Sequence, residues 1–235
     1  MKKKLKQKQG GFKGQVVKIE SLKPESGPSR EAVEEAVQRI RSGGIIAFPT
    51  ETFYGLGVDP FNPAAVERLF AVKGRESGKP IPIIIDELIR AEGIIGTISE
   101  ESRALIEKFW PGPLTLLFAT SSRLSSALTG GTGKVGIRIP SHPVALRLLR
   151  AIGQPITATS ANRSGVPGAT SAAGVQEMLG EHLDLIIDGG ETPGGTGSTI
   201  VDTSFHPPRL IREGKIPYQE ILGCLGLGLT EDHEW

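Results

Sequence analysis

Residues 45–57 read IIAFPTETFYGLG, and this stretch indicates the kind of fold. Its first five residues form a short apolar run after two glycines, which is typical of a strand buried on both faces. The polar Thr50-Glu51-Thr52 follows at once, and the two glycines of YGLG predict a turn. In open α/β sheets, ligands bind where strands give way to loops. The stretch therefore predicts a buried strand whose polar end either simply stops the strand or faces a ligand.

Apolar strands and helical segments alternate along the rest of the chain. Further strands are expected at 81–86, 114–118, 135–139, 184–188, 198–202 and 209–212, and PITATS (155–160) is expected to lead into a loop. Helices are expected between Ser29 and Gly43, after Asn62-Pro63, and at 99–109, 143–152, 171–179 and 217–223. This alternation predicts an α/β fold. The last strands lack long helices between them, so the sheet is expected to be mixed.

Length and composition limit the class of protein. With 235 residues and 38% hydrophobic content, the chain can bury a substantial core. We expect an N-terminal extension over 1–14, one domain over 15–222 and a short tail over 223–235. No run of 18 apolar residues occurs, and the single Cys224 excludes an intramolecular disulfide. The N-terminus also lacks the apolar core of a secretory signal, so a cytoplasmic location is expected.

Positive charge is concentrated at the N-terminus. Residues 1–14 carry six lysines and no acidic residue, in a chain whose formal net charge is +1. One interpretation is an arm that binds RNA phosphates weakly. The other is a disordered, solubilising terminus, and the composition favours this second interpretation.

Four polar clusters stand out at strand ends and in loops. They are the stretch around Thr50, VKGRESGKP (72–80), ATSANRSG (158–165) and GGTGST (194–199). The second carries three cations that suit a polyphosphate, and the fourth has backbone amides that an anion could approach closely. A single such cluster is more often an ordinary loop. Four in one chain favour a pocket for a nucleotide or an anionic substrate.

Standard catalytic motifs do not account for these clusters. GGTGKV (130–135) resembles a phosphate-binding loop, but the first glycine is missing and Val135 stands where Ser or Thr is required. No GxGxxG opens a helix after a strand, and the four histidines lack metal-ligand spacing. Ser160 has no nucleophile-elbow context. Covalent catalysis is therefore poorly supported, which leaves positioning and charge neutralisation.

The ordered motifs PTETFYGLG, KGR with KP, PGPLT, RIPSHP, SAN-SG-P, STIVD and IREG strongly resemble the YrdC family over roughly residues 30–215. The resemblance implies a YrdC-like fold, a twisted mixed β-sheet with flanking helices around a concave basic cavity. It also implies a nucleotidyltransferase that forms threonylcarbamoyl-AMP and pyrophosphate from L-threonine, bicarbonate or CO2, and ATP. A separate transferase complex would then use the product for threonylcarbamoyladenosine modification of tRNA. Longer members carry a second C-terminal domain, so this chain is expected to be a short form.

The resemblance implies roles for individual residues. The catalytic KxR…SxN signature of the family falls on Lys73, Arg75, Ser160 and Asn162. The L-threonine contacts correspond to Thr50, Arg138, Ala158 and Ser198. The ATP contacts correspond to Arg75, Lys79, Lys134, Ser160, Gly168 and Arg212. Some members place a histidine after the KxR loop, and here Ile84 occupies the aligned position, so that contact is absent or replaced.

The residue types agree with this chemistry. Arg138 can pair bidentately with an amino-acid carboxylate. The cations would neutralise a triphosphate while a carbamate oxygen attacks the α-phosphorus. The sequence offers no obvious carboxylate pair for Mg2+, so no protein metal ligand is assigned. The ion is expected to be bound by the phosphates of ATP.

Three alternatives stay open. The first is a YciO-like paralogue, although the complete KxR…SxN signature argues against it. The second is a non-catalytic RNA-binding module, although an aromatic content of 5% is low for a base-stacking platform. The third is carbamoyl transfer to a hydrogenase, which in the family needs additional domains.

Overall fold

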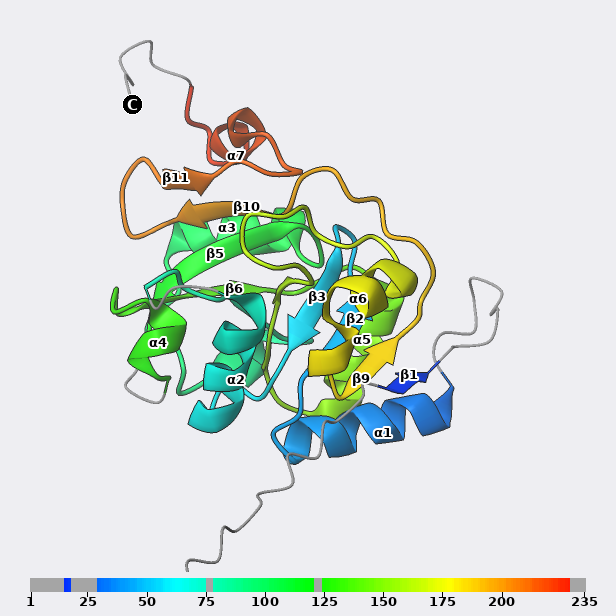
Figure 1. Ribbon diagram of the computed structural model, residues 1–235. Coiled ribbons are helices and arrows are strands. Elements are labelled where there is room, and N and C mark those ends of the chain that lie inside the picture. Colours follow the sequence, from blue (N-terminus) through cyan, green and yellow to red (C-terminus); the bar gives the residue numbers. More distant parts are fainter. Residues whose placement is uncertain (1–14, 18–28, 75–77, 121–123, 229–235) are drawn as a thin grey trace, which may run out of the picture.

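The computed structural model describes residues 15–17, 29–74, 78–120 and 124–228 (Figure 1). The lysine-rich residues 1–14, the loop residues 75–77 with Arg75, and residues 229–235 of the expected tail lie outside the described residues. The helices are α1 (Arg30–Arg41), α2 (Pro63–Lys73), α3 (Glu100–Phe109), α4 (Ser126–Thr129), α5 (Pro143–Ile152), α6 (Ala172–Leu179) and α7 (Tyr218–Cys224), with 3-10 turns at Leu88–Ala91 and Gly180–His182.

The strands of the described residues form two twisted mixed sheets. The β2 sheet has the order β1 (Gln15–Val17), β9 (Leu185–Ile187), β2 (Ile46–Pro49), β3 (Tyr54–Gly57) and β8 (Thr159–Ser160). The β5 sheet has the order β11 (Arg209–Arg212), β10 (Thr199–Asp202), β5 (Leu114–Ala119), β6 (Lys134–Arg138), β4 (Ile83–Ile84) and β7 (Ile156–Thr157). The expected mixed α/β architecture with flanking helices is confirmed, with its strands divided between two sheets.

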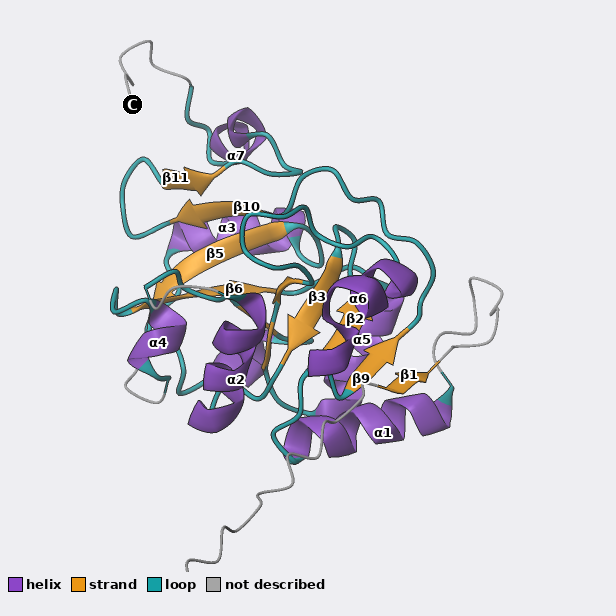
Figure 2. Ribbon diagram, in the orientation of Figure 1, coloured by secondary structure: helices purple, strands orange, loops and turns teal. Residues whose placement is uncertain are grey.

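The helices lie around these sheets (Figure 2) and bury apolar side chains against them. In α1, the Ser29 side chain accepts a hydrogen bond from the Ala32 amide, and the spacing of Val33, Ala36 and Ile40 places all three in the interior. α1 packs against α5, and both helices pack against β2. Their buried apolar side chains form one core cluster. A larger cluster joins both sheets to α2, α3, α6 and α7. The two sheets therefore share one interior.

The YGLG segment corrects one expectation, because it forms strand β3 and not a turn. β3 runs antiparallel to β2, with Phe48 opposite Gly55. A Cβ atom on Gly57 would lie 2.9 Å from Phe48 Cε1 and 3.0 Å from Ile156 Cδ1. Glycine is therefore required there for close packing inside the sheet, which the sequence pattern does not distinguish from a requirement for a turn.

The segment 156–160 connects the two sheets. β7 pairs with β4 in the β5 sheet, whereas β8 pairs with β3 in the β2 sheet. Thr157 lies at this crossing with no exposed surface, and its hydroxyl oxygen accepts a hydrogen bond from the Val58 amide at 3.0 Å. The segment PITATS, which was expected to lead into a loop, thus contributes a short strand to each sheet before the loop that follows Ser160. None of the described helices is long and apolar enough to cross a lipid bilayer.

Candidate active site

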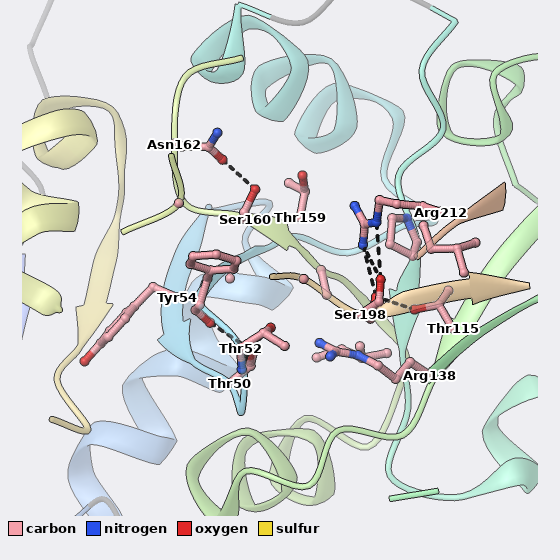
Figure 3. Close-up of a pocket in the computed structure, with 18 of the residues that line it drawn as sticks. Thr50, Thr52, Tyr54, Thr115, Arg138, Thr159, Ser160, Asn162, Ser198 and Arg212 are labelled. Carbon is pink, nitrogen blue, oxygen red and sulfur yellow. Dashed lines mark hydrogen bonds between the residues drawn. The ribbon is translucent and has the colours of Figure 1, made fainter. Parts of the chain in front are cut away.

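A cavity of about 300 Å³ lies where the two sheets meet (Figure 3). Its walls come from the β2–β3 hairpin, from the ends of β4, β6 and β11, from the segment after β7, and from the starts of β5 and β10. The expected site residues that line it are Thr50, Arg138, Ala158, Ser160, Asn162, Gly168, Ser198 and Arg212. Lys73, Lys79 and Lys134 do not line it, and Arg75 lies outside the described residues.

Thr50 closes the hairpin between β2 and β3. Its hydroxyl donates a hydrogen bond to the Phe53 carbonyl at 2.7 Å, and its oxygen lies 3.2 Å from the Thr52 amide and 3.0 Å from the Thr52 hydroxyl. Because the Thr50 proton is used on Phe53, the Thr52 hydroxyl is the donor to Thr50. The Thr50 hydroxyl is therefore satisfied within the hairpin, and Thr52 keeps acceptor lone pairs beside the cavity.

Arg138 reaches from the end of β6 into the cavity, toward Thr50 and Thr52 (Figure 3). Its Nη1 donates to Glu51 Oε1 at 2.8 Å, and the Arg138 residue is 6% exposed. Burial lowers the pKa of Arg138, and the charge of Glu51 acts in the opposite direction. Burial also lowers the pKa of the nearby His142, again opposed by Glu51. The guanidinium thus meets the cavity as half of a buried ion pair.

Ser198 and Arg212 form the opposite wall. The Ser198 hydroxyl lies 2.9 Å from the Thr115 hydroxyl, and Arg212 Nη2 donates to the Ser198 carbonyl at 2.7 Å. A Cβ atom on Gly197 would lie 3.0 Å from Arg212 Nη2, so the glycine lets the guanidinium lie close against the backbone. These contacts hold the Arg212 guanidinium at the cavity.

The KxR…SxN signature forms a buried network through its three described members. Lys73 is 2% exposed, and its ammonium donates to the Ser160 carbonyl at 2.5 Å, the Asn162 carbonyl at 3.0 Å and Asn162 Oδ1 at 3.1 Å. The Asn162 amide nitrogen donates to the carbonyls of Arg163 and Val166. Lys73 therefore ties the end of α2 to the loop that forms the cavity wall. Its predicted catalytic role stays a prediction.

Two expected ATP contacts lie away from the cavity lining. The Lys134 ammonium lies 2.5 Å from Asp202 Oδ2 and 2.7 Å from Ser204 Oγ, and 4.9 Å from the centroid of the Phe205 ring. Burial raises the pKa of Asp202, but the hydrogen bonds from Lys134 and Ser204 outweigh it, so the pKa lies below its usual value. Lys79 is exposed, next to the cavity residue Pro80.

Sequence reasoning missed Glu51, Thr52, Thr115 and Asp202 as partners of the expected residues. Glu51 and Thr52 lie within the quoted polar stretch, so their type and position were available signals. Thr115 is the last residue of the PGPLT motif and the one polar residue of the strand expected at 114–118, so it too could have been noticed. No group of three His, Cys, Asp or Glu residues among the described residues could hold a metal ion.

Comparison with known proteins identifies the family. The family model described as "Telomere recombination", which groups Sua5, YciO and YrdC proteins, matches residues 38–214. The chain belongs to the Sua5/YciO/YrdC family. The resemblance to YrdC proteins found in the sequence motifs is therefore confirmed, and the YrdC-like fold is the fold of this family.

Members of the Sua5/YciO/YrdC family differ in length. A Pyrococcus abyssi threonylcarbamoyl-AMP synthase is 43% identical over 202 residues, which cover 84% of this chain and 59% of that protein. The chain thus spans about three fifths of that relative. A Thiobacillus denitrificans threonylcarbamoyl-AMP synthase is 39% identical over 175 residues, which cover 74% of this chain and 93% of that protein.

Solved structures of the family share the fold. P. abyssi Sua5 complexed with L-threonine has a TM-score of 0.82 and 39% identity, covering 90% of this chain and 61% of that one. E. coli YciO has a TM-score of 0.78 and 26% identity, covering 89% of this chain and all of that one.

Proposed function

We propose that this chain is an L-threonylcarbamoyladenylate synthase, a nucleotidyltransferase that forms threonylcarbamoyl-AMP and pyrophosphate from L-threonine, bicarbonate or CO2, and ATP. The observation that carries the proposal is the cavity between the sheets, which is lined by Arg138 together with Thr52 and Ser198. An arginine fork and short hydroxyls suit the carboxylate and side chain of a small hydroxy amino acid. Two relatives named for this product, and a Sua5 structure that holds L-threonine, support it.

In the proposed reaction, the threonine carboxylate binds Arg138 and its hydroxyl meets Thr52 or Ser198. After the amine has been carboxylated, a carbamate oxygen bonds to the α-phosphorus and the bond to pyrophosphate breaks. Arg212 lies at the cavity and would neutralise charge on the phosphates, together with Arg75, Lys79 and Lys134, the other cations among the ATP contacts that the resemblance implies. The network of Lys73, Ser160 and Asn162 would keep the wall in place, and holding three reactants together lowers the entropic barrier.

Mg2+ is proposed to accompany ATP. The cavity lining of the described residues offers hydroxyl oxygens but no carboxylate, so the ion would be held by phosphate oxygens and water. Bound there, it would neutralise phosphate charge. A cytoplasmic location, delivery of the product to a tRNA-modifying transferase complex, and weak RNA binding belong to the same proposal.

The alternatives have less support. The named synthases are 39–43% identical to this chain, compared with 26% for YciO. No observation among the described residues favours a non-catalytic RNA-binding role over the synthase.

The test is pyrophosphate release from ATP with bicarbonate, comparing L-threonine, L-serine and no amino acid. We expect release that requires both L-threonine and bicarbonate. Arg138→Lys keeps the charge but loses the fork, and we expect kcat/KM to fall at least about tenfold. Arg150→Lys, on the exposed side of α5, is the matched control and should keep full activity. ATP binding without threonine-dependent release would contradict the proposal.

A further inference from the structure

The ion pair at the cavity wall has an uneven arrangement. Arg138 and Glu51 join through one nitrogen and one oxygen at 2.8 Å, and their side chains are only 8% and 14% exposed. Glu51 is a hydrogen-bond partner of the Arg138 guanidinium. The second oxygen, Glu51 Oε2, is buried and has no hydrogen-bond partner among the described residues. One edge of the guanidinium is thus held, and the carboxylate keeps unused acceptor capacity.

Glu51 lies behind the cavity wall. Its neighbours Thr50 and Thr52 line the cavity, whereas Glu51 does not, so its side chain acts on a ligand through its field and through Arg138. Burial makes that field stronger than it would be in water. The nearby His142 also feels the charge of Glu51, but burial lowers the pKa of His142 and so favours its neutral form. The charges considered at this wall are therefore those of the Arg138–Glu51 ion pair.

A neutral ion pair discriminates between ligands by their charge. A plain carboxylate is attracted by Arg138 and repelled by Glu51, so it gains little net attraction. An α-amino acid brings an ammonium next to its carboxylate, and the ammonium is attracted by Glu51. The same pair would thus favour a zwitterion and disfavour an anion of the same shape.

We propose that Glu51 is a specificity-determining positioning residue, which makes the cavity select zwitterionic α-amino acids over carboxylates that lack an ammonium group. The proposal rests on the proposed function only in taking L-threonine as the amino acid. It assigns Glu51 two tasks, to hold one edge of the Arg138 guanidinium and to supply the negative charge that the ammonium requires.

The test measures, without ATP, the affinities for L-threonine and for 2,3-dihydroxybutanoate, in which a hydroxyl replaces the ammonium. The wild-type protein should prefer L-threonine at least about tenfold. Glu51→Gln keeps the shape and an oxygen acceptor for Arg138 but removes the charge. We expect it to lose most of this preference, by weaker binding of L-threonine and tighter binding of the anion.

Two further variants control for damage to the fold. Asp86→Asn removes another buried carboxylate that has an unpartnered oxygen, away from the cavity lining, and should keep the wild-type preference. Glu51→Asp keeps the negative charge and should keep part of the preference for L-threonine. A full preference in Glu51→Gln, or an equal loss in Glu51→Asp, would overturn the proposal. So would a wild-type protein that binds both ligands equally.

The ligand preference and pyrophosphate release can fail separately. If the preference for L-threonine depends on Glu51 but no threonine-dependent pyrophosphate release occurs, the proposed synthase function is wrong and the proposed role of Glu51 stands. If pyrophosphate release depends on threonine but Glu51→Gln keeps the wild-type ligand preference, the synthase function stands and the proposed role of Glu51 is wrong.

Discussion

At the scale of single residues, Lys73 shows how a cation can serve a site without lining it. Its ammonium lies in the interior, 2% exposed, among oxygens of Ser160 and Asn162. Those oxygens belong to the loop whose other atoms line the cavity. The lysine thus stabilises a wall of the site from behind, much as Glu51 holds Arg138.

Replacing Lys73 by methionine should therefore reduce stability as well as activity. The change would leave buried carbonyl oxygens without their donor, and we expect the free energy of unfolding to fall by about 3 kcal/mol. Lys108→Met, at an exposed position in the last turn of α3, is the control and should change it by less than about 0.5 kcal/mol. Urea denaturation measures both. Equal losses in the two variants would show that the buried network contributes nothing.

At the scale of elements, the β2–β3 hairpin forms one wall of the cavity and depends on glycine for its packing. Gly55 and Gly57 both lie on β3 beside Phe48, but they differ in the space around them. Around Gly55, the nearest atoms to an added Cβ are at 3.4 to 3.6 Å, which is an ordinary contact. Around Gly57, they are at 2.9 and 3.0 Å.

This difference gives a matched pair of variants. Gly57→Ala should force Phe48 or Ile156 to move, and we expect a loss of about 2 kcal/mol in the free energy of unfolding. Gly55→Ala should stay within about 1 kcal/mol of the original protein. Thermal or urea unfolding of the two variants provides the comparison. If both lost the same amount, a general cost of alanine in this strand would explain the result better than the contact with Phe48.

The elements also show what the sequence alone can predict. The amphipathic pattern of α1 and α5 and the apolar runs of β5 and β6 predicted these elements. Such patterns depend only on residues that are close together in the sequence. β3 was missed, because close packing against Phe48 and Ile156 is a tertiary requirement. The site residues were named from family motifs, which cannot tell whether a cation such as Lys73 or Lys134 points into the cavity or toward an oxygen of the protein.

At the scale of the whole molecule, the cavity is built by both sheets. Thr50 and Thr52 come from the hairpin of the β2 sheet, whereas Arg138 is the end of β6 in the β5 sheet and Ser198 directly precedes β10 of that sheet. The segment 156–160 crosses between the sheets at the same place. A ligand in the cavity therefore contacts both sheets at once.

Saturating L-threonine should accordingly stabilise the molecule as a unit. At 100 times Kd, linkage predicts a gain of about 2.7 kcal/mol in the free energy of unfolding, and hence a rise in Tm of about 5–10 °C. Hydrogen exchange should slow in β2 and β3 as well as in β6 and β10. Protection confined to one sheet would contradict a ligand that bridges them.

The cavity walls consist mainly of threonine, serine, glycine, proline and alanine. Such side chains have few rotatable bonds, so ordering them around a ligand loses little conformational entropy. The two long side chains, Arg138 and Arg212, would lose more, up to about 2 kcal/mol each, but Glu51 and Ser198 already hold them. Most of the rotameric freedom has thus been lost during folding, and the affinity for a small ligand should closely reflect the contacts that it makes.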